Sequence, residues 1–259
     1  MLLQRKNAVV YGAGGAIGGA VARAFAREGA RVFLAGRTLA KVDAVAKEIS
    51  AAGGAAETAH VDALDEEAVE KHLETVVKKT GRIDISFNAV GFEEMQGIPL
   101  IDLSLEDFAF PIAAWSRTVF LTGRAAARRM TKQGSGVILT INAPEGHEAL
   151  AGGFAAACAA VLALSRTLAA EVGPQGVRVL CLQPNAIPES AALRRSVAQH
   201  AEGTGVEVEE FLASMANETL LRRLPTLEEV ANVATFMASD RASAMTGTIV
   251  KLNCGSAVD

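Results

Sequence analysis

A glycine-rich segment near the start of the chain has the residue types needed to hold a phosphate group. Tyr11 is followed by Gly-Ala-Gly-Gly-Ala-Ile-Gly, which ends at Gly18. The apolar run 7–11 precedes this segment, and a helical pattern of apolar residues begins directly behind it. Small residues in such a strand–turn–helix context let backbone amides approach a pyrophosphate, with the helix N-terminus pointing at it. The spacing therefore predicts a dinucleotide-binding loop; the alternative is a tight glycine turn without a ligand.

The elements that must position this loop alternate between short apolar runs and longer helical periods, the signature of βαβ units around a parallel sheet. Strands are expected at residues 7–11, 31–35, up to about 61, 83–87, 137–141, 177–182 and 249–252. Helices are expected from Ala16 onward, after a cap at Thr38, and over 69–77, 112–130 and 154–171. The capping box Thr226-Leu-Glu-Glu229 is expected to begin one more. The segment 184–224 is the least regular. The sequence has no internal repeat, linker or break in composition, so we expect one domain over 1–259.

Composition excludes several classes of protein. Half of the 259 residues are hydrophobic and 21% are charged, which suits a folded chain with a sizeable core. Three scattered cysteines predict neither a disulfide framework nor a metal site, and a net charge of −4 without a basic run predicts no nucleic-acid binding. The N-terminus lacks a signal-peptide core, so a cytoplasmic location is expected. The uncharged stretch 149–165 is rich in Ala and Gly and shorter than the roughly 18 strongly apolar residues of a membrane span, so we expect a buried or interface helix.

Further motifs give the chain a family resemblance. Asn88-Ala-Val-Gly91 closes the fourth strand, Asp62 follows the third, and Pro184-Asn-Ala-Ile187 follows the sixth. With the glycine loop and the C-terminal segment from Leu221 to Gly247, these resemble the short-chain dehydrogenase/reductase family over nearly the whole chain. The resemblance implies a three-layer α/β/α Rossmann-type fold with a doubly wound sheet of seven parallel strands. It also implies a homotetramer or homodimer, which would form through the helices at 112–130 and 154–171.

The resemblance assigns cofactor positions residue by residue. Gly12 and Gly18 match the outer glycines of the loop. Ala16 stands where the commonest family pattern has the middle glycine, whereas Gly15 fits the variant with a glycine at every third residue. Asp62 matches the residue that holds the adenine edge. The other positions implied for the cofactor are Gly14 and Ile17 in the loop and Asn88, Ala89 and Gly91 near the ribose.

Arg37 indicates which cofactor is expected. It follows Ala35-Gly36, where members that prefer NADP place a basic residue for the 2′-phosphate. An NAD site would want an acidic residue at this strand end, to accept from the ribose hydroxyls, and none is present there. The resemblance therefore favours NADP(H) over NAD(H). The alternatives are an exposed arginine at a helix start and, for Asn88, a strand-end cap.

The catalytic pair that the resemblance implies, a Tyr followed four residues later by a Lys, is missing. The only tyrosine in the chain is Tyr11, and no lysine lies between Lys132 and Lys251. Phenylalanine has no proton to donate, and a thiol with an ordinary pKa of about 8.5 cannot replace a fixed positive charge. A positioned general acid contributes about 10²–10⁴-fold to a rate. Efficient ketone reduction by the family's mechanism is therefore not expected.

Alignment on Leu164-Ser-Arg-Thr-Leu-Ala169 shows which residues stand in those places. Phe154 falls at the tyrosine position and Cys158 at the lysine position. Ala143 falls at the position of the family's serine, or Asn142 if the register shifts by one, and the family's helix Asn position falls near Trp115. We expect Cys158 and Trp115 to be packing residues.

Another group must then handle the proton. His147 lies between Glu145 and Glu148 in the loop behind the fifth strand, which borders the substrate cleft in this family, and histidine exchanges protons near neutral pH. Its alternative is a solvated loop histidine. Glu93 and Glu94, just behind the fourth strand, are further candidates, although solvation at the surface is the favoured interpretation for both.

Three hypotheses for the activity follow. The first is a divergent NADP(H)-dependent oxidoreductase that acts on a carbonyl or an activated alkene as a small-molecule substrate, which the segment 184–224 would cover. The second is a pseudoenzyme that binds the cofactor and acts as a structural or regulatory partner without redox turnover. A lyase or dehalogenase on the same fold is the weakest, because relatives of that kind usually keep the Ser and Tyr.

Overall fold

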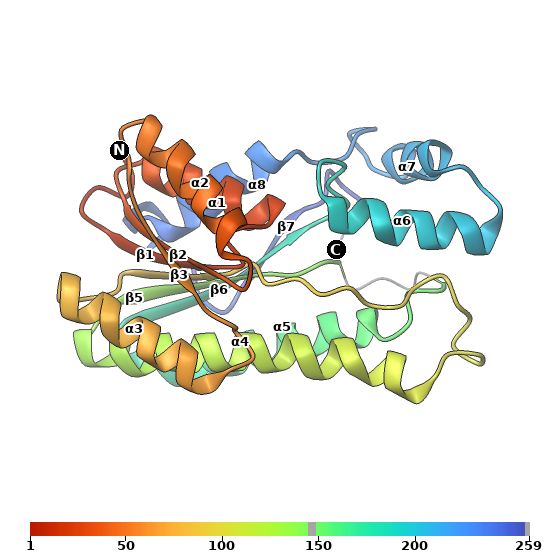
Figure 1. Ribbon diagram of the computed structural model, residues 1–259. Coiled ribbons are helices and arrows are strands. Elements are labelled where there is room, and N and C mark those ends of the chain that lie inside the picture. Colours follow the sequence, from red (N-terminus) through yellow and green to blue (C-terminus); the bar gives the residue numbers. More distant parts are fainter. Residues whose placement is uncertain (145–148, 257–259) are drawn as a thin grey trace.

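Seven parallel strands form one sheet in the order β3-β2-β1-β4-β5-β6-β7 (Figure 1). The structure is a computed structural model, and it describes residues 1–144 and 149–256. The strands are β1 (Asn7–Tyr11), β2 (Arg31–Gly36), β3 (Ala55–His60), β4 (Ile85–Asn88), β5 (Gly136–Ile141), β6 (Val177–Pro184) and β7 (Ile249–Leu252). This confirms the predicted single-domain, doubly wound α/β fold.

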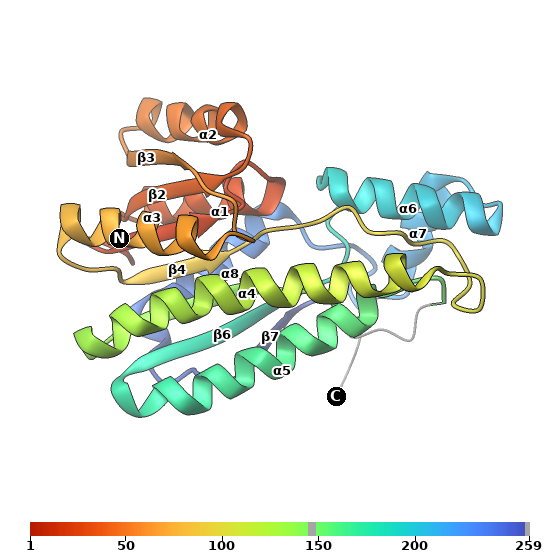
Figure 2. The same ribbon diagram turned by 60° about the horizontal axis from the view of Figure 1, so that its bottom comes forward.

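The helices form one layer on each face of the sheet and a further pair beyond the carboxyl ends of the strands. They are α1 (Ala16–Arg27), α2 (Leu39–Ala51), α3 (Glu66–Thr80), α4 (Leu105–Gln133), α5 (Phe154–Val172), α6 (Ala191–Thr204), α7 (Val208–Asn217) and α8 (Leu227–Ala238). Helices α1, α2 and α8 cover one face of the sheet, and α3, α4 and α5 cover the other (Figures 1 and 2). The predicted helices 112–130 and 154–171 are thus parts of α4 and α5.

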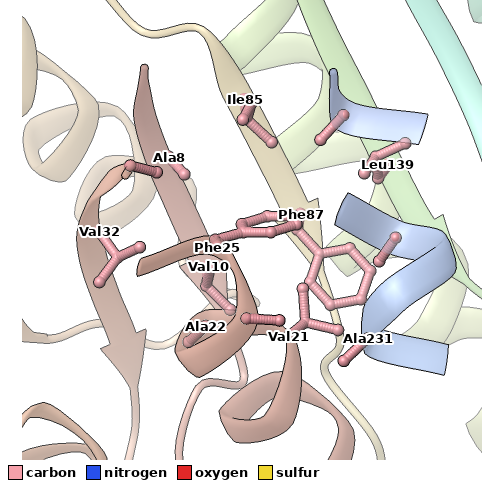
Figure 3. Packing of buried hydrophobic residues seen from close by; sticks show 14 of the residues in the cluster. Ala8, Val10, Val21, Ala22, Phe25, Val32, Ile85, Phe87, Leu139 and Ala231 are labelled. Carbon is pink, nitrogen blue, oxygen red and sulfur yellow. The ribbon is translucent and has the colours of Figure 1, made fainter. Parts of the chain in front are cut away.

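Alternating side chains of the central strands build both layers of the core. Val10 of β1 packs toward α1 and α8, whereas its neighbour Val9 packs toward α3 and α4, as the two-residue period of a strand requires. On the first face, the rings of Phe25 and Phe87 lie 6.4 Å apart in an edge-to-face contact (Figure 3). Burying a side chain of this size stabilises the fold by about 1.5–3 kcal/mol.

Strand β4 begins two residues later than expected, because residues far away in the sequence bind the backbone before it. Both backbone groups of Ile83 are bound by the side-chain amide of Gln133, at the end of α4. Asp84 accepts from the backbone N–H of Asn7 at 2.8 Å. The Gln133 contacts replace strand pairing at Ile83, whereas the backbone of Asp84 still donates to the carbonyl oxygen of Asn7 and accepts from the N–H of Val137, both at 2.9 Å.

The segment 184–224, predicted to be the least regular, instead contains the two helices α6 and α7, so that prediction was wrong. Both lie beyond the carboxyl ends of the strands (Figures 1 and 2). They pack on one another, for example through the rings of His200 and Phe211, whose centroids are 5.6 Å apart. The apolar sides of the two helices pack on one another rather than on the sheet, so they add no further βαβ unit to the pattern of the chain.

Helix α5 is long and apolar enough, by length and composition alone, to cross a membrane; the apolar segment runs over 154–175 with a mean hydropathy of 1.5. Core helices of soluble proteins pass the same test. Here α5 packs against α4 and β6, and its buried side includes Val161, Leu162 and Ala169.

Candidate functional site

A cavity of about 830 Å³ opens at the carboxyl ends of the strands. At one end it is lined by the glycine loop and the starts of α1 and α2, and at the other by residues of α6 and α7. The ends of β3, β4, β5 and β6 form its floor. In open α/β sheets, ligands bind at this edge, where the strand order reverses around β1 and β4.

The glycine loop approaches the end of β4 so closely that glycine is required. Gly12 has φ +73°, and a Cβ atom there would lie 2.5 Å from the carbonyl oxygen of Ala89. A Cβ atom on Gly18 would overlap the carbonyl oxygen of Gly12. Gly18 therefore serves the packing of α1 on β1 and lies outside the cavity lining, whereas Gly12 lines the cavity.

The N-terminus of α1 faces the cavity without a side-chain cap. Gly15 is the residue before the helix, and no acidic residue lies in the first turn. Gly14, Gly15 and Ile17 all line the cavity, together with Ala16. The first backbone N–H groups of a helix lack intrahelical partners and carry partial positive charge, so this end can bind a phosphate.

Arg37, Thr38 and Lys41, here called the cationic corner, lie beside this helix, between the end of β2 and the start of α2. Arg37, Thr38 and Lys41 line the cavity and are exposed. Within residues 1–144 and 149–256, neither Arg37 nor Lys41 forms an ion pair. Thr38 stands at the start of α2 as predicted, but its side chain makes no capping hydrogen bond, so the expected cap is wrong and the hydroxyl is available to a ligand. Lys41 was missed in the sequence, where it looks like an ordinary helix lysine.

The remaining cofactor positions of the prediction divide into two groups. Asp62, Ala89 and Gly91 line the cavity. Asp62 accepts from the backbone N–H of Leu64 at 2.9 Å, which fixes the turn behind β3. Asn88 lies outside the lining: it is buried, donates to Thr122 of α4 at 2.8 Å and accepts from the N–H of Val90 at 2.9 Å. The Asn88 side chain thus fixes the backbone conformation at the end of β4.

Four aromatic rings lie at the cavity wall beyond the glycine loop. Phe154, the first residue of α5, packs against Trp115, and Trp115 packs against Phe92, with centroid separations of 5.1 and 6.4 Å. Phe110 lies 6.0 Å from Phe92. All four residues line the cavity, so this wall is apolar. Trp115 is a packing residue, as expected.

Comparison with known proteins gives a family. A family model described as Enoyl-(Acyl carrier protein) reductase matches residues 12–257. An uncharacterized oxidoreductase of Thermotoga maritima is 31% identical over 262 residues, which cover 99% of both chains. The chain belongs to the short-chain dehydrogenase/reductase family. An uncharacterized oxidoreductase of Mycobacterium tuberculosis is 34% identical, with 98% of this chain and 92% of the relative covered. The crystal structure of NAD+-bound xylitol dehydrogenase superposes with a TM-score of 0.92 at 25% identity, covering 97% of this chain and 99% of that one.

The residues that we predict at the catalytic positions of the short-chain dehydrogenases/reductases are apolar or buried. Phe154 and Ala143 line the cavity, whereas Cys158 is fully buried in α5. Asn142, at the end of β5, donates its amide to the carbonyl oxygen of Cys158 at 3.0 Å, so it joins β5 to α5. The predicted proton donor His147, with Glu145 and Glu148, lies outside the described residues.

Tyr11 does not stand in for the family's tyrosine. Its side chain is buried on the α3 and α4 side of the sheet, where its ring contacts His72 at 6.1 Å. Burial raises the pKa of the Tyr11 hydroxyl, and the hydroxyl has no hydrogen-bond partner within the described residues. Tyr11 also lines the cavity, but its hydroxyl is buried on the other side of the sheet.

Four polar side chains lie at the far end of the cavity, Glu94, Gln96, Ser196 and His200. Sequence reasoning named Glu94 as a candidate and missed the other three. Solvation at the surface was the favoured interpretation for Glu94, but the structure buries this side chain in part and turns it to the cavity. No local pattern marks these residues, because 100 residues separate Gln96 from Ser196.

Proposed function

We propose that the protein is an NADP(H)-dependent oxidoreductase that reduces a carbonyl or an activated alkene. Membership of the short-chain dehydrogenase/reductase family supports dinucleotide chemistry, and the description of the matching family model, an enoyl reductase, is consistent with an activated alkene. The four aromatic rings at the cavity wall favour an apolar substrate. When bound, the cofactor supplies a hydride.

The residues that line the cavity have the chemistry needed to hold a dinucleotide cofactor. Gly12, Gly14 and Gly15 line the cavity without side chains, and the uncapped N-terminus of α1 would bind the pyrophosphate. Asp62 would hold the adenine edge, and the backbone at Ala89 and Gly91 would lie against the ribose.

The observation that carries the preference for NADP(H) is the cationic corner. Arg37 and Lys41 lie within four residues of each other at the start of α2, both without an ion pair among the described residues. The free hydroxyl of Thr38 and the uncapped start of the helix lie between them. Two cations and a helix N-terminus suit a 2′-phosphate, whereas NAD(H) carries no group that would use them.

The test is a fluorescence titration of the purified protein with NADPH and, in parallel, with NADH. We expect NADPH to bind at least tenfold more tightly. Equal affinities, or tighter binding of NADH, would contradict the role of the corner. Turnover is tested next with NADPH and a panel of aromatic ketones, aliphatic ketones and 2-enones.

A second candidate is a protein that binds the cofactor without turnover. The observation that favours it is the apolar α5 wall: Phe154 and Ala143 offer no side-chain donor to a substrate oxygen. Absence of NADPH oxidation across the whole panel, together with tight binding of NADPH, would select this candidate. We also propose that copies of the chain assemble through α4 and α5, which light scattering would test.

A further inference from the structure

A fixed chain of hydrogen bonds joins the loop behind β4 to helix α6 at the cavity. The Oε1 atom of Glu94 accepts from the Nε2 atom of Gln96 at 2.9 Å. The Oε1 atom of Gln96 accepts from the Ser196 hydroxyl at 2.5 Å, and the backbone N–H of Gln96 donates to Gln199 at 3.3 Å. Because Ser196 fixes which end of the Gln96 amide faces Glu94, the carboxyl group is held in one place.

Glu94 lines the cavity from a partly buried position. The charged groups that face it are Glu93 on its own loop and Arg195 on α6, and these two form an ion pair at 3.1 Å. Burial raises the pKa of Glu94 by more than the hydrogen bond from Gln96 and the charge of Arg195 lower it. A carboxyl group of this kind keeps a proton closer to neutral pH than an exposed one does.

We propose that Glu94 donates the proton to the substrate oxygen, in place of the tyrosine that the family uses at the start of α5. This inference rests on the proposed oxidoreductase function. For a ketone, the carbonyl carbon accepts a hydride and its electron pair from the reduced nicotinamide, which is oxidised. The carbon–oxygen π bond breaks, and the oxygen takes the proton of Glu94. The alcohol leaves, and water from the open cavity returns a proton to the Glu94 carboxylate.

The other titratable groups at the cavity are less suited. The Nδ1 atom of His200 lies 3.0 Å from the carbonyl oxygen of Ser196, which can only accept, so the proton on Nδ1 is engaged within α6. Asp62 lies at the opposite, phosphate-binding end and is engaged with the N–H of Leu64. Cys158 is fully buried.

The experiment compares Glu94→Gln and Glu94→Asp with the wild type, using NADPH and the best ketone of the panel. Glu202→Gln, which changes an exposed glutamate of α6, is the matched control. We expect Glu94→Gln to lower kcat at least about 100-fold, with the affinity for NADPH unchanged. In the wild type, kcat should fall as pH rises through the pKa of Glu94, because the donor must be protonated. Glu94→Asp should keep this pH dependence, and Glu94→Gln should lose it.

A second readout does not use turnover. In protein labelled with ¹³C at the glutamate carboxyl groups, NMR should show one carboxyl resonance that titrates above the usual range and that disappears in Glu94→Gln. If Glu94→Gln keeps the wild-type kcat and pH profile, Glu94 is not the donor. If His200→Gln or His147→Gln removes the pH dependence instead, that histidine is the donor and the proposal is overturned. A wild type that oxidises no NADPH with any compound overturns the proposed function itself, and the donor role with it.

Discussion

The ring of Phe154, at the first position of α5, lies 5.1 Å from the ring of Trp115 on α4, with the two planes tilted by 49°. Aromatic packing between the two helices therefore holds the side chain that we predict at the family's tyrosine position. This contact makes the α5 side of the cavity apolar.

Removing this ring should destabilise the protein. Because Phe154 is half-buried, we expect Phe154→Ala to lower the free energy of unfolding by about 1–2 kcal/mol, below the range for fully buried rings. Phe154→Tyr keeps the ring and should stay within about 0.5 kcal/mol of the wild type. Urea denaturation of the three proteins measures this. Equal stability of Phe154→Ala and the wild type would show that the contact with Trp115 contributes nothing.

Gly12 should tolerate no side chain. In Gly12→Ala the new Cβ atom would meet the carbonyl oxygen of Ala89, and φ +73° is unfavourable for alanine. We expect a loss of more than about 1 kcal/mol of stability and loss of NADPH binding. Gly173→Ala, at the end of α5 and outside the cavity lining, is the control, since φ is −56° there and a Cβ atom has nothing within 4 Å. Thermal unfolding and fluorescence titration give the two quantities; a Gly12→Ala protein that binds NADPH normally would contradict the loop's role.

The cationic corner should strengthen the binding of NADPH and have no effect on the binding of NADH. We expect Arg37→Ala and Lys41→Ala each to weaken NADPH binding by about tenfold, which corresponds to about 1.4 kcal/mol, and to leave NADH binding unchanged. The effect should shrink as salt is added, because both side chains are exposed. Arg23→Ala on α1, whose arginine is paired with Glu48 at 2.9 Å, serves as a control. If the two substitutions weaken the binding of NADPH and of NADH equally, Arg37 and Lys41 do not bind a 2′-phosphate.

His72 should make the protein sensitive to acid. Burial lowers the pKa of His72 to about 4 from its ordinary value of 6.5. The folded state therefore favours the neutral ring, and this contribution to stability is present above pH 6.5 and is lost as pH falls toward 4. By linkage the loss amounts to roughly 3 kcal/mol over that window.

His72→Gln should flatten the dependence of unfolding free energy on pH between 7 and 4. His60→Gln, which changes an exposed histidine at the end of β3, should leave the dependence unchanged. Urea denaturation at several pH values measures both. If His60→Gln flattens the curve and His72→Gln does not, the burial of His72 has no bearing on acid stability.

Features that depend on neighbours in sequence were predicted correctly from the sequence. The glycine loop needs only a strand, small residues and a helix behind it, and Gly12 and Gly15 lie where the pattern placed them. The capping box of Thr226 and Glu229 is present as expected, because it spans only four residues. β7 has the predicted bounds, and every other strand lies within two residues of its prediction.

Features that depend on distant segments were decided by the tertiary structure. Gln133 binds the backbone of Ile83 and delays β4, and Thr122 engages Asn88 and takes it out of the cavity lining. Glu94 looked like a solvated loop residue until the hydrogen bond between Gln96 and Ser196 brought α6 over it. The burial and hydrogen bonding of a side chain depend on the residues that the fold packs against it. When these residues are distant in sequence, they cannot be predicted from residue type or from spacing along the chain.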